Sequence, residues 1–206
     1  MKKYITELIG TFFLVFVIGL SGNPLAIGGI LMAMVFMGGH TSGAHYNPAV
    51  TLAIWIRKKI DAKDAMMYML FQIIGALLAA TAFHFMYGKT FAPMPDHSIN
   101  IMKPLFIEMV FTFALASVVL NVATHSKTNG NSFYGFAIGF TVLGAAIAGG
   151  KISGGAFNPA VGIGPIVVDA IFGTGKALHD LWIYLVGPFI GGAVAAVMFR
   201  MMHPEE

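Results

Sequence analysis

Two asparagines in nearly identical surroundings are the first candidates for chemistry in this sequence. Asn47-Pro48-Ala49 and Asn158-Pro159-Ala160 lie in the stretches 42–50 and 153–161, which share six of their nine residues. Asn is a preferred N-cap, and Pro suits the first helical position because an N–H there would have no partner within the helix. Each copy therefore predicts a loop that leads into a helix capped by an Asn side chain.

The apolar segments that follow the two copies are too short to cross a bilayer. They run from 48 to 55 and from 159 to 172 at most, whereas a crossing helix needs about 20 residues. Half-helices at membrane depth are stable only where they line a cavity enclosed by protein. There, each Asn would offer its NH₂ to a solute, and both helix N-termini would oppose cations and protons. Plain helix capping is the alternative, but it does not explain why the whole setting repeats.

Two carboxylates and two histidines complete the set of candidate polar groups. Glu7 and Glu108 fall within predicted spans, where a carboxylate is a functional candidate by default. We favour a structural brace for the loops, because a proton relay needs a second titrating partner that the sequence does not offer. His40 and His45 lack a third ligand for a metal site. His45 more simply ties down the first loop, and pH gating is the alternative role for it.

The composition is that of a membrane protein. Hydrophobic residues make up 57% of the chain and charged residues 10%, whereas soluble domains carry about 25% charged residues. Six spans fill the 206 residues, and the net charge of +3 does not indicate nucleic-acid binding. Cysteine is absent, and no cofactor motif or catalytic cluster is visible. The expected fold is an all-α membrane bundle with two re-entrant half-helices and six transmembrane helices, at about 4–22, 24–39, 64–87, 103–124, 133–149 and 177–202.

The two halves of the chain, 1–100 and 101–206, resemble each other beyond the tripeptide. Glu7 and Thr11 match Glu108 and Thr112. Three spans per half is an odd number, so the second half must enter the membrane from the opposite side, which makes the repeats inverted. The half-helices then meet near the midplane. Lys and Arg are more frequent on the side with both termini, which predicts cytoplasmic termini in a multi-pass protein of the cell (inner) membrane.

The paired Asn-Pro-Ala copies after Gly-rich loops, together with the paired glutamates, resemble the major intrinsic protein family of aquaporins and aquaglyceroporins. The resemblance covers essentially the full chain. It implies a homotetramer in the lipid bilayer with one pore per subunit. It also implies that Asn47 and Asn158 point their amides into the pore, and that Glu7 and Glu108 accept hydrogen bonds from the loop backbones.

The outer constriction of this family is formed by four side chains, which match Ile27, Ala146, Gly155 and Val161 here. Family members usually carry Arg at the position of Val161, so this chain departs from the pattern. Arg supplies a rigid set of donors and a permanent positive charge. Without it, the filter is expected to be wider and apolar, which favours larger neutral solutes relative to water.

The sequence thus predicts a passive channel for water and small neutral solutes, and no enzyme activity. A channel chiefly for glycerol, urea, ammonia, carbon dioxide or a neutral metalloid hydroxide is the first alternative. A secondary transporter also uses inverted repeats and broken helices, but it normally needs charge at the midplane. A non-conducting structural protein is the remaining alternative.

Overall fold

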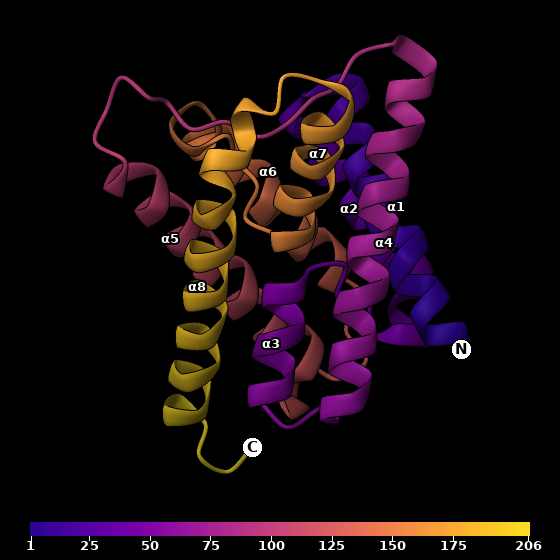
Figure 1. Cartoon of the computed structure of the whole chain (residues 1–206). Helices are drawn as coiled ribbons and strands as arrows, with labels where there is room; N and C mark the ends of the chain where they lie inside the picture. The colour runs from indigo at the N-terminus through magenta and orange to yellow at the C-terminus, as the bar shows by residue number, and fades with distance from the viewer.

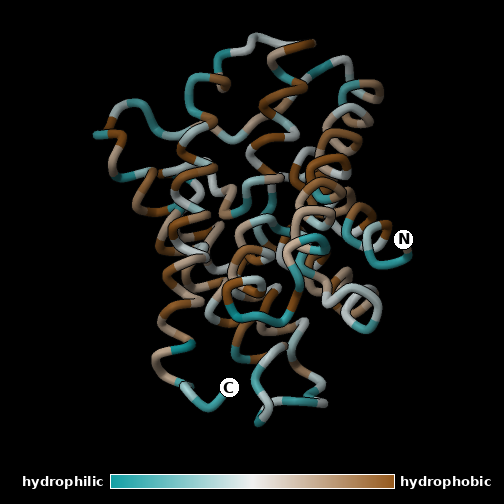
Figure 2. Tube along the Cα trace, turned by 60° about the horizontal axis from the view of Figure 1, so that its bottom comes forward, coloured by the Kyte–Doolittle hydropathy of each residue, from teal (hydrophilic) through white to brown (hydrophobic).

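The computed structural model describes all 206 residues as a bundle of helices without strands (Figure 1). Six helices are long and apolar enough to cross a membrane. Hydrophilic residues concentrate in the loops and near the chain ends (Figure 2). The crossing helices are α1 Lys2–Ser21, α2 Pro24–Ser42, α4 Ala62–Tyr87, α5 Met102–Val119, α6 Tyr134–Ser153 and α8 Leu181–Met202.

Two of these helices end later than the sequence predicts. The expected spans stop at 39 and 149, whereas α2 and α6 continue to Ser42 and Ser153. The glycines before those ends are helical and give space to side chains: a Cβ at Gly38 would overlap the Tyr46 ring hydroxyl. The left-handed residue that ends each helix comes afterwards, at Gly43 (φ +84°) and Gly154 (φ +90°), as is usual for a helix C-terminus.

Two further spans are less regular than predicted. The fourth continues beyond α5 as a π-helical turn, Leu120–Thr124, and the sixth begins with a 3₁₀ turn, Lys176–Asp180, before α8. A second 3₁₀ turn, Ser126–Thr128, lies in the short connection to α6. These irregular turns lie at the ends of the spans.

Two short helices, α3 Pro48–Ile56 and α7 Pro159–Phe172, enter the bundle from opposite ends. Their N-termini meet in the middle of the molecule, and their C-termini point toward opposite faces (Figure 1). Both pack against α4 and α8. The residues just before them, Tyr46 and Phe157, are almost completely buried, so the centre of the bundle is built around the two loops.

Small residues allow close contact between the crossing helices. A Cβ at Gly28 of α2 would lie 2.6 Å from the carbonyl oxygen of Gly139 in α6. Likewise, a Cβ at Gly75 would lie 2.4 Å from the Leu8 carbonyl oxygen, and α8 approaches α5 in the same way at Gly191. Such contacts are the usual means of helix association in lipid. They hold the six spans tightly around the two half-helices.

Candidate functional site

The side-chain oxygen of each repeated Asn caps its own half-helix. Asn47 Oδ1 accepts hydrogen bonds from Ala49 N at 2.8 Å and Val50 N at 3.4 Å. Asn158 Oδ1 accepts one from Ala160 N at 2.9 Å. These are the caps that the sequence predicts. Because each oxygen is held by backbone N–H groups, each NH₂ group must point away from its own helix.

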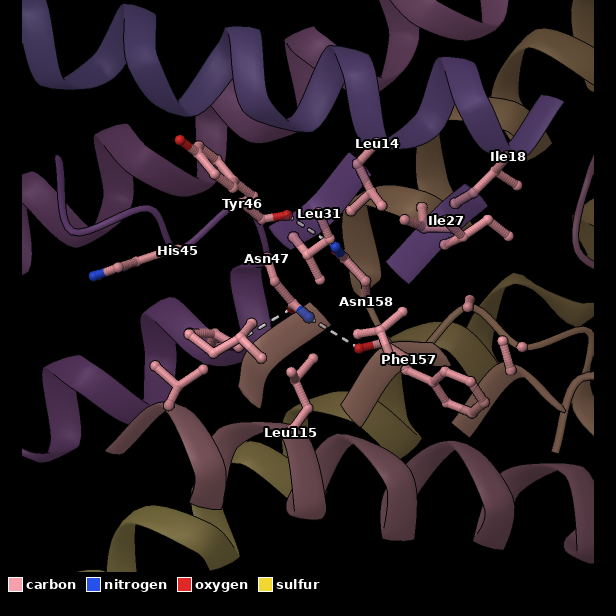
Figure 3. A pocket seen from close by; sticks show the side chains of 18 of the residues that line it. Leu14, Ile18, Ile27, Leu31, His45, Tyr46, Asn47, Leu115, Phe157 and Asn158 are labelled. Atoms are coloured by element: carbon pink, nitrogen blue, oxygen red, sulfur yellow. Dashed lines mark hydrogen bonds between the residues drawn. The ribbon is translucent and has the colours of Figure 1, made fainter. Parts of the chain in front are cut away.

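The NH₂ groups also tie the two loops to each other. Asn47 Nδ2 donates to the Phe157 carbonyl oxygen, and Asn158 Nδ2 donates to the Tyr46 carbonyl oxygen, both at 2.9 Å (Figure 3). Tyr46 and Phe157 both adopt φ +49°, a strained conformation for a residue with a side chain. An amide NH₂ carries two hydrogens, so one hydrogen of each Asn stays available. The sequence alone suggested two fully free NH₂ groups, and this reciprocal pairing is a difference from that expectation.

A buried carboxylate binds the first loop. Glu7 has no exposed surface. Its Oε1 accepts from Ser42 Oγ at 2.6 Å and from His45 N at 3.0 Å. Its Oε2 accepts from Tyr46 N and from Gln72 Nε2, both at 2.7 Å. The carboxylate therefore satisfies loop N–H groups that have no partner in secondary structure.

The second loop is bound in the same manner by Glu108, which is also fully buried. Its Oε1 accepts from Ser153 Oγ at 2.7 Å and from Ala156 N at 3.0 Å, and its Oε2 accepts from Phe157 N at 2.6 Å. No counterpart of Gln72 contacts this carboxylate. The two loops thus share a brace geometry, with one additional donor on the first.

The two Asn side chains border a cavity of about 30 Å³. A single buried water molecule needs a cavity of at least about 10–15 Å³, so this cavity has room for water. No charged side chain lines the cavity, and most of its lining is apolar. All four positions singled out in the sequence line it: Ile27, Ala146, Gly155 and Val161.

Sequence reasoning missed most of the apolar wall of this cavity. Figure 3 shows several of these side chains beside the two Asn amides. Their helices are apolar on every side, so no periodicity separates a cavity-facing position from a lipid-facing one. On the crossing helices, the residues missed are Leu14, Ile18, Leu31, Leu115, Val119, Ile138 and Val142.

His45 lies between this cavity and a larger hollow of about 520 Å³ on the side of the chain termini, because it lines both. Its Nδ1 is 3.1 Å from Thr51 Oγ1, and its ring packs edge-on against Tyr68 at 5.0 Å. His40 is exposed and does not join it. No group of three or more His, Cys, Asp or Glu residues is arranged to hold a metal ion.

The sequence is similar to a protein family and to several known proteins. A family model described as Major intrinsic protein matches residues 1–199. The chain is 37% identical to "Glycerol uptake facilitator protein-like 6" of Lactiplantibacillus plantarum, with 100% of both chains covered. It is 33% identical to "Aquaporin NIP1-4" of Oryza sativa subsp. japonica, over 98% of this chain and 77% of that one.

Among solved structures, the aquaglyceroporin from Plasmodium falciparum superposes with a TM-score of 0.87 at 23% identity, covering 99% of this chain and 97% of that one. The fold is therefore the aquaporin fold. Together with the family match over nearly the whole chain, this shows that the chain belongs to the major intrinsic protein family, whose members are passive channels rather than enzymes.

Proposed function

We propose that the chain forms one pore per subunit, and that water and small neutral solutes pass between Asn47 and Asn158. The observation that carries this proposal is the reciprocal bonding of the two amides at a shared cavity. Each amide is fixed by its own helix and by the opposite loop. One N–H per Asn is left to donate to a passing oxygen atom, so a solute in single file would exchange water contacts for two oriented donors.

Ions are expected to be excluded at the same point. The cavity offers no carboxylate to a cation, and the N-termini of α3 and α7 both direct partial positive charge toward it. The apolar walls add a second barrier, because an ion would lose its hydration without replacement. The carboxylates of Glu7 and Glu108 do not line the cavity, and we assign them a structural role as loop braces.

The constriction formed by Ile27, Ala146, Gly155 and Val161 would lack strong hydrogen-bond donors. Water loses hydrogen bonds in such a segment, whereas solutes with fewer hydrogen bonds per unit surface lose less. The cavity in this structure is small, about 30 Å³, so a solute as large as glycerol would pass only as flanking side chains such as Leu14 and Ile18 change rotamer. The constriction would thus reach the width expected from the sequence only when these side chains move.

The lining of the same constriction is the basis for our proposal of the physiological solute. Because the filter carries no Arg, we place glycerol, urea, ammonia, carbon dioxide and neutral metalloid hydroxides beside water as candidates. The name of the bacterial relative, "Glycerol uptake facilitator protein-like 6", favours glycerol-sized solutes. We further propose that His45 positions the first loop through Thr51, with pH gating as the alternative role.

We also propose a repeat organisation, an oligomeric state and a membrane orientation for the chain. Residues 1–100 and 101–206 form two inverted repeats, in keeping with the matched braces at Glu7 and Glu108. The subunits assemble as homotetramers in the cell (inner) membrane. Both termini lie at one end of the molecule (Figure 1), and the excess of basic residues there supports a cytoplasmic location.

Osmotic shrinkage of proteoliposomes, followed by stopped-flow light scattering, tests the function. Water, glycerol, urea and an impermeant sugar are compared at matched protein density, with protein-free liposomes as the control. A passive channel gives flux that rises linearly with solute concentration and needs no ion gradient. Saturating or ion-coupled flux would instead support a transporter, and flux equal to that of empty liposomes would support a structural role.

A further inference from the structure

A second hollow, far from the pore residues, lies where α3 and α8 end on the face that carries both termini. Its volume is about 650 Å³, and it shares no lining residue with the central cavity. Its basic lining residues are Arg57, Lys58, Lys59, Arg200 and His203. We call this feature the basic hollow.

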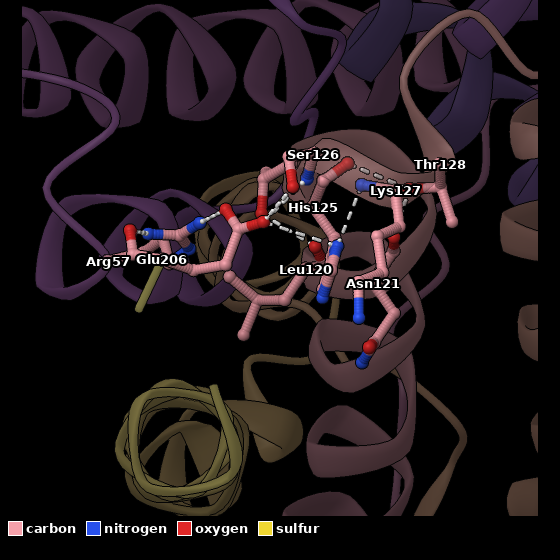
Figure 4. A network of polar contacts seen from close by, with 9 residues as sticks. Arg57, Leu120, Asn121, His125, Ser126, Lys127, Thr128 and Glu206 are labelled. Atoms are coloured by element: carbon pink, nitrogen blue, oxygen red, sulfur yellow. Dashed lines mark hydrogen bonds and ion pairs between the residues drawn. The ribbon is translucent and has the colours of Figure 1, made fainter. Parts of the chain in front are cut away.

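Most of the positive charge in the basic hollow is unpaired. Lys58, Lys59 and Arg200 are exposed, and none of them forms an ion pair. The acidic residue in the lining, Glu206, is already bound: its Oε2 lies 2.8 Å from Arg57 Nη2, and its Oε1 accepts from Ser126 N at 2.9 Å (Figure 4). Three exposed cations therefore face one hollow in which the Glu206 side-chain carboxylate is already bound.

The wall behind these cations is fixed. The Arg57 side chain is only 3% exposed and stacks on Phe199, with its guanidinium carbon 4.7 Å from the ring centroid. Lys58 adopts φ +62°, at a helix C-terminus where Gly is the usual residue. A side chain there costs backbone strain. The turn thus carries a lysine where glycine would be less strained.

The hollow also has an apolar side. Val197 and Met201 of α8 line it and are 51% and 76% exposed. Both belong to a membrane-length helix. Trp55, 44% exposed in the last turn of α3, is of the residue type enriched at the membrane–water interface. The basic hollow therefore joins a lipid-facing apolar wall to a cationic rim.

We propose that the basic hollow binds the phosphate headgroup of an anionic phospholipid from the leaflet on this side of the membrane. Lys58, Lys59 and Arg200 would contact the phosphate, and an acyl chain would lie along Val197 and Met201. Basic pockets at the membrane surface hold anionic headgroups in this way. A free phosphate would use the cationic rim alone, whereas a lipid uses both sides of the hollow.

Native mass spectrometry of the full chain in detergent tests this site without reference to flux. Phosphatidylglycerol and phosphatidylcholine are titrated separately, and bound lipid is counted. The test variant combines Lys58→Gly, which suits the left-handed backbone, with Lys59→Gln and Arg200→Gln on exposed positions. A control variant removes the same amount of charge near the opposite face through Lys89→Gln, Lys103→Gln and Lys176→Gln.

The wild type should prefer phosphatidylglycerol by at least about ten-fold, given the attraction of anionic lipid for each nearby Lys or Arg. The test variant should lose most of that preference, and the control variant should keep it. Inorganic phosphate at millimolar concentration should not displace the lipid. An unchanged preference in the test variant would overturn the proposal, as would displacement by phosphate, which would indicate a free-anion site.

Discussion

At the scale of single residues, the loop conformation depends on buried acceptors. Glu108 accepts hydrogen bonds from two N–H groups of the second loop and from Ser153 at the end of α6, and no side chain equivalent to Gln72 supports it. The peptide N–H groups of Ala156 and Phe157 are buried, and both donate to the Glu108 carboxylate. The Glu108 carboxylate therefore stabilises the strained residue Phe157, whose carbonyl oxygen receives the Asn47 amide.

Glu108→Gln is expected to lower stability by about 1–3 kcal/mol, because an amide NH₂ would replace one acceptor and face a buried donor. Thermal unfolding of the detergent-solubilised protein measures this, with the exposed Glu205→Gln as the control that should change little. Selectivity among neutral solutes should stay close to that of the wild type. A variant of normal stability that lost proton-dependent transport would instead assign Glu108 to a proton relay.

Glu206 forms a contact whose contribution to stability depends on pH. Its carboxylate accepts hydrogen bonds from the hydroxyl and the N–H of Ser126, and these bonds, with His125 and Arg57 nearby, lower the pKa of Glu206 to about 2. A lowered pKa means that this contact contributes stability above the ordinary value of 4.5 and loses it as pH falls toward 2.

The wild type should therefore be more stable than Glu206→Gln at pH 5, and the difference in their melting temperatures should shrink between about pH 4.5 and pH 2. Paired thermal unfolding across that range measures the difference. Glu205→Gln serves as the matched control and should show no such pH dependence. A melting-temperature difference that stays constant down to pH 2 would contradict the assigned contact.

At the scale of elements, local sequence rules specify the half-helices, but they do not specify how these meet. The Asn caps and the short lengths of α3 and α7 follow from the Asn-Pro dipeptides and the apolar runs after them. The hydrogen bond from Asn47 Nδ2 to the Phe157 carbonyl oxygen joins residues 110 positions apart. No local propensity encodes such a contact.

Helix ends show the same division between local and tertiary causes. Glycine near 38 and 149 reads as a helix break in the sequence, but these positions stay helical because neighbouring side chains occupy the space of the missing Cβ. The π-helical turn Leu120–Thr124 also lacked a local signal. By contrast, Ile27, Ala146, Gly155 and Val161 could be placed at the cavity only by resemblance to the family, since apolar residues occur on all faces of these helices.

At the scale of the whole molecule, one subunit already contains a complete cavity and both half-helices. Gly75 and Gly191, together with the buried Ala79 and Ala195, pack against other helices of the same chain, so the proposed tetramer would use other surfaces for its contacts. Many large apolar side chains remain exposed, among them Phe106, Phe136 and Ile147. Lipid and neighbouring subunits together would cover this surface.

We predict a homotetramer with four independent pores. Mass measurement in nanodiscs should give four times the 22.0 kDa of one chain, and in liposomes the water permeability of each tetramer should be the sum of four equal subunit contributions. Mixed tetramers with a blocked subunit provide the control, because their flux should fall in proportion to the blocked fraction. A stable monomer in native-like nanodiscs would contradict the proposed assembly.

We propose that solutes pass through the cavity bordered by Asn47, Asn158 and Val161. Val161→Arg places an obligatory charge and a fixed set of donors in that cavity, whereas Val161→Leu adds bulk without donors and serves as its control. Paired water and glycerol shrinkage kinetics on liposomes at matched protein density give one ratio for each protein. We expect Val161→Arg to raise the water-to-glycerol ratio above those of the wild type and Val161→Leu, with water flux still measurable. A ratio unchanged by Val161→Arg, or a wild type that excludes every solute larger than water, would contradict the account.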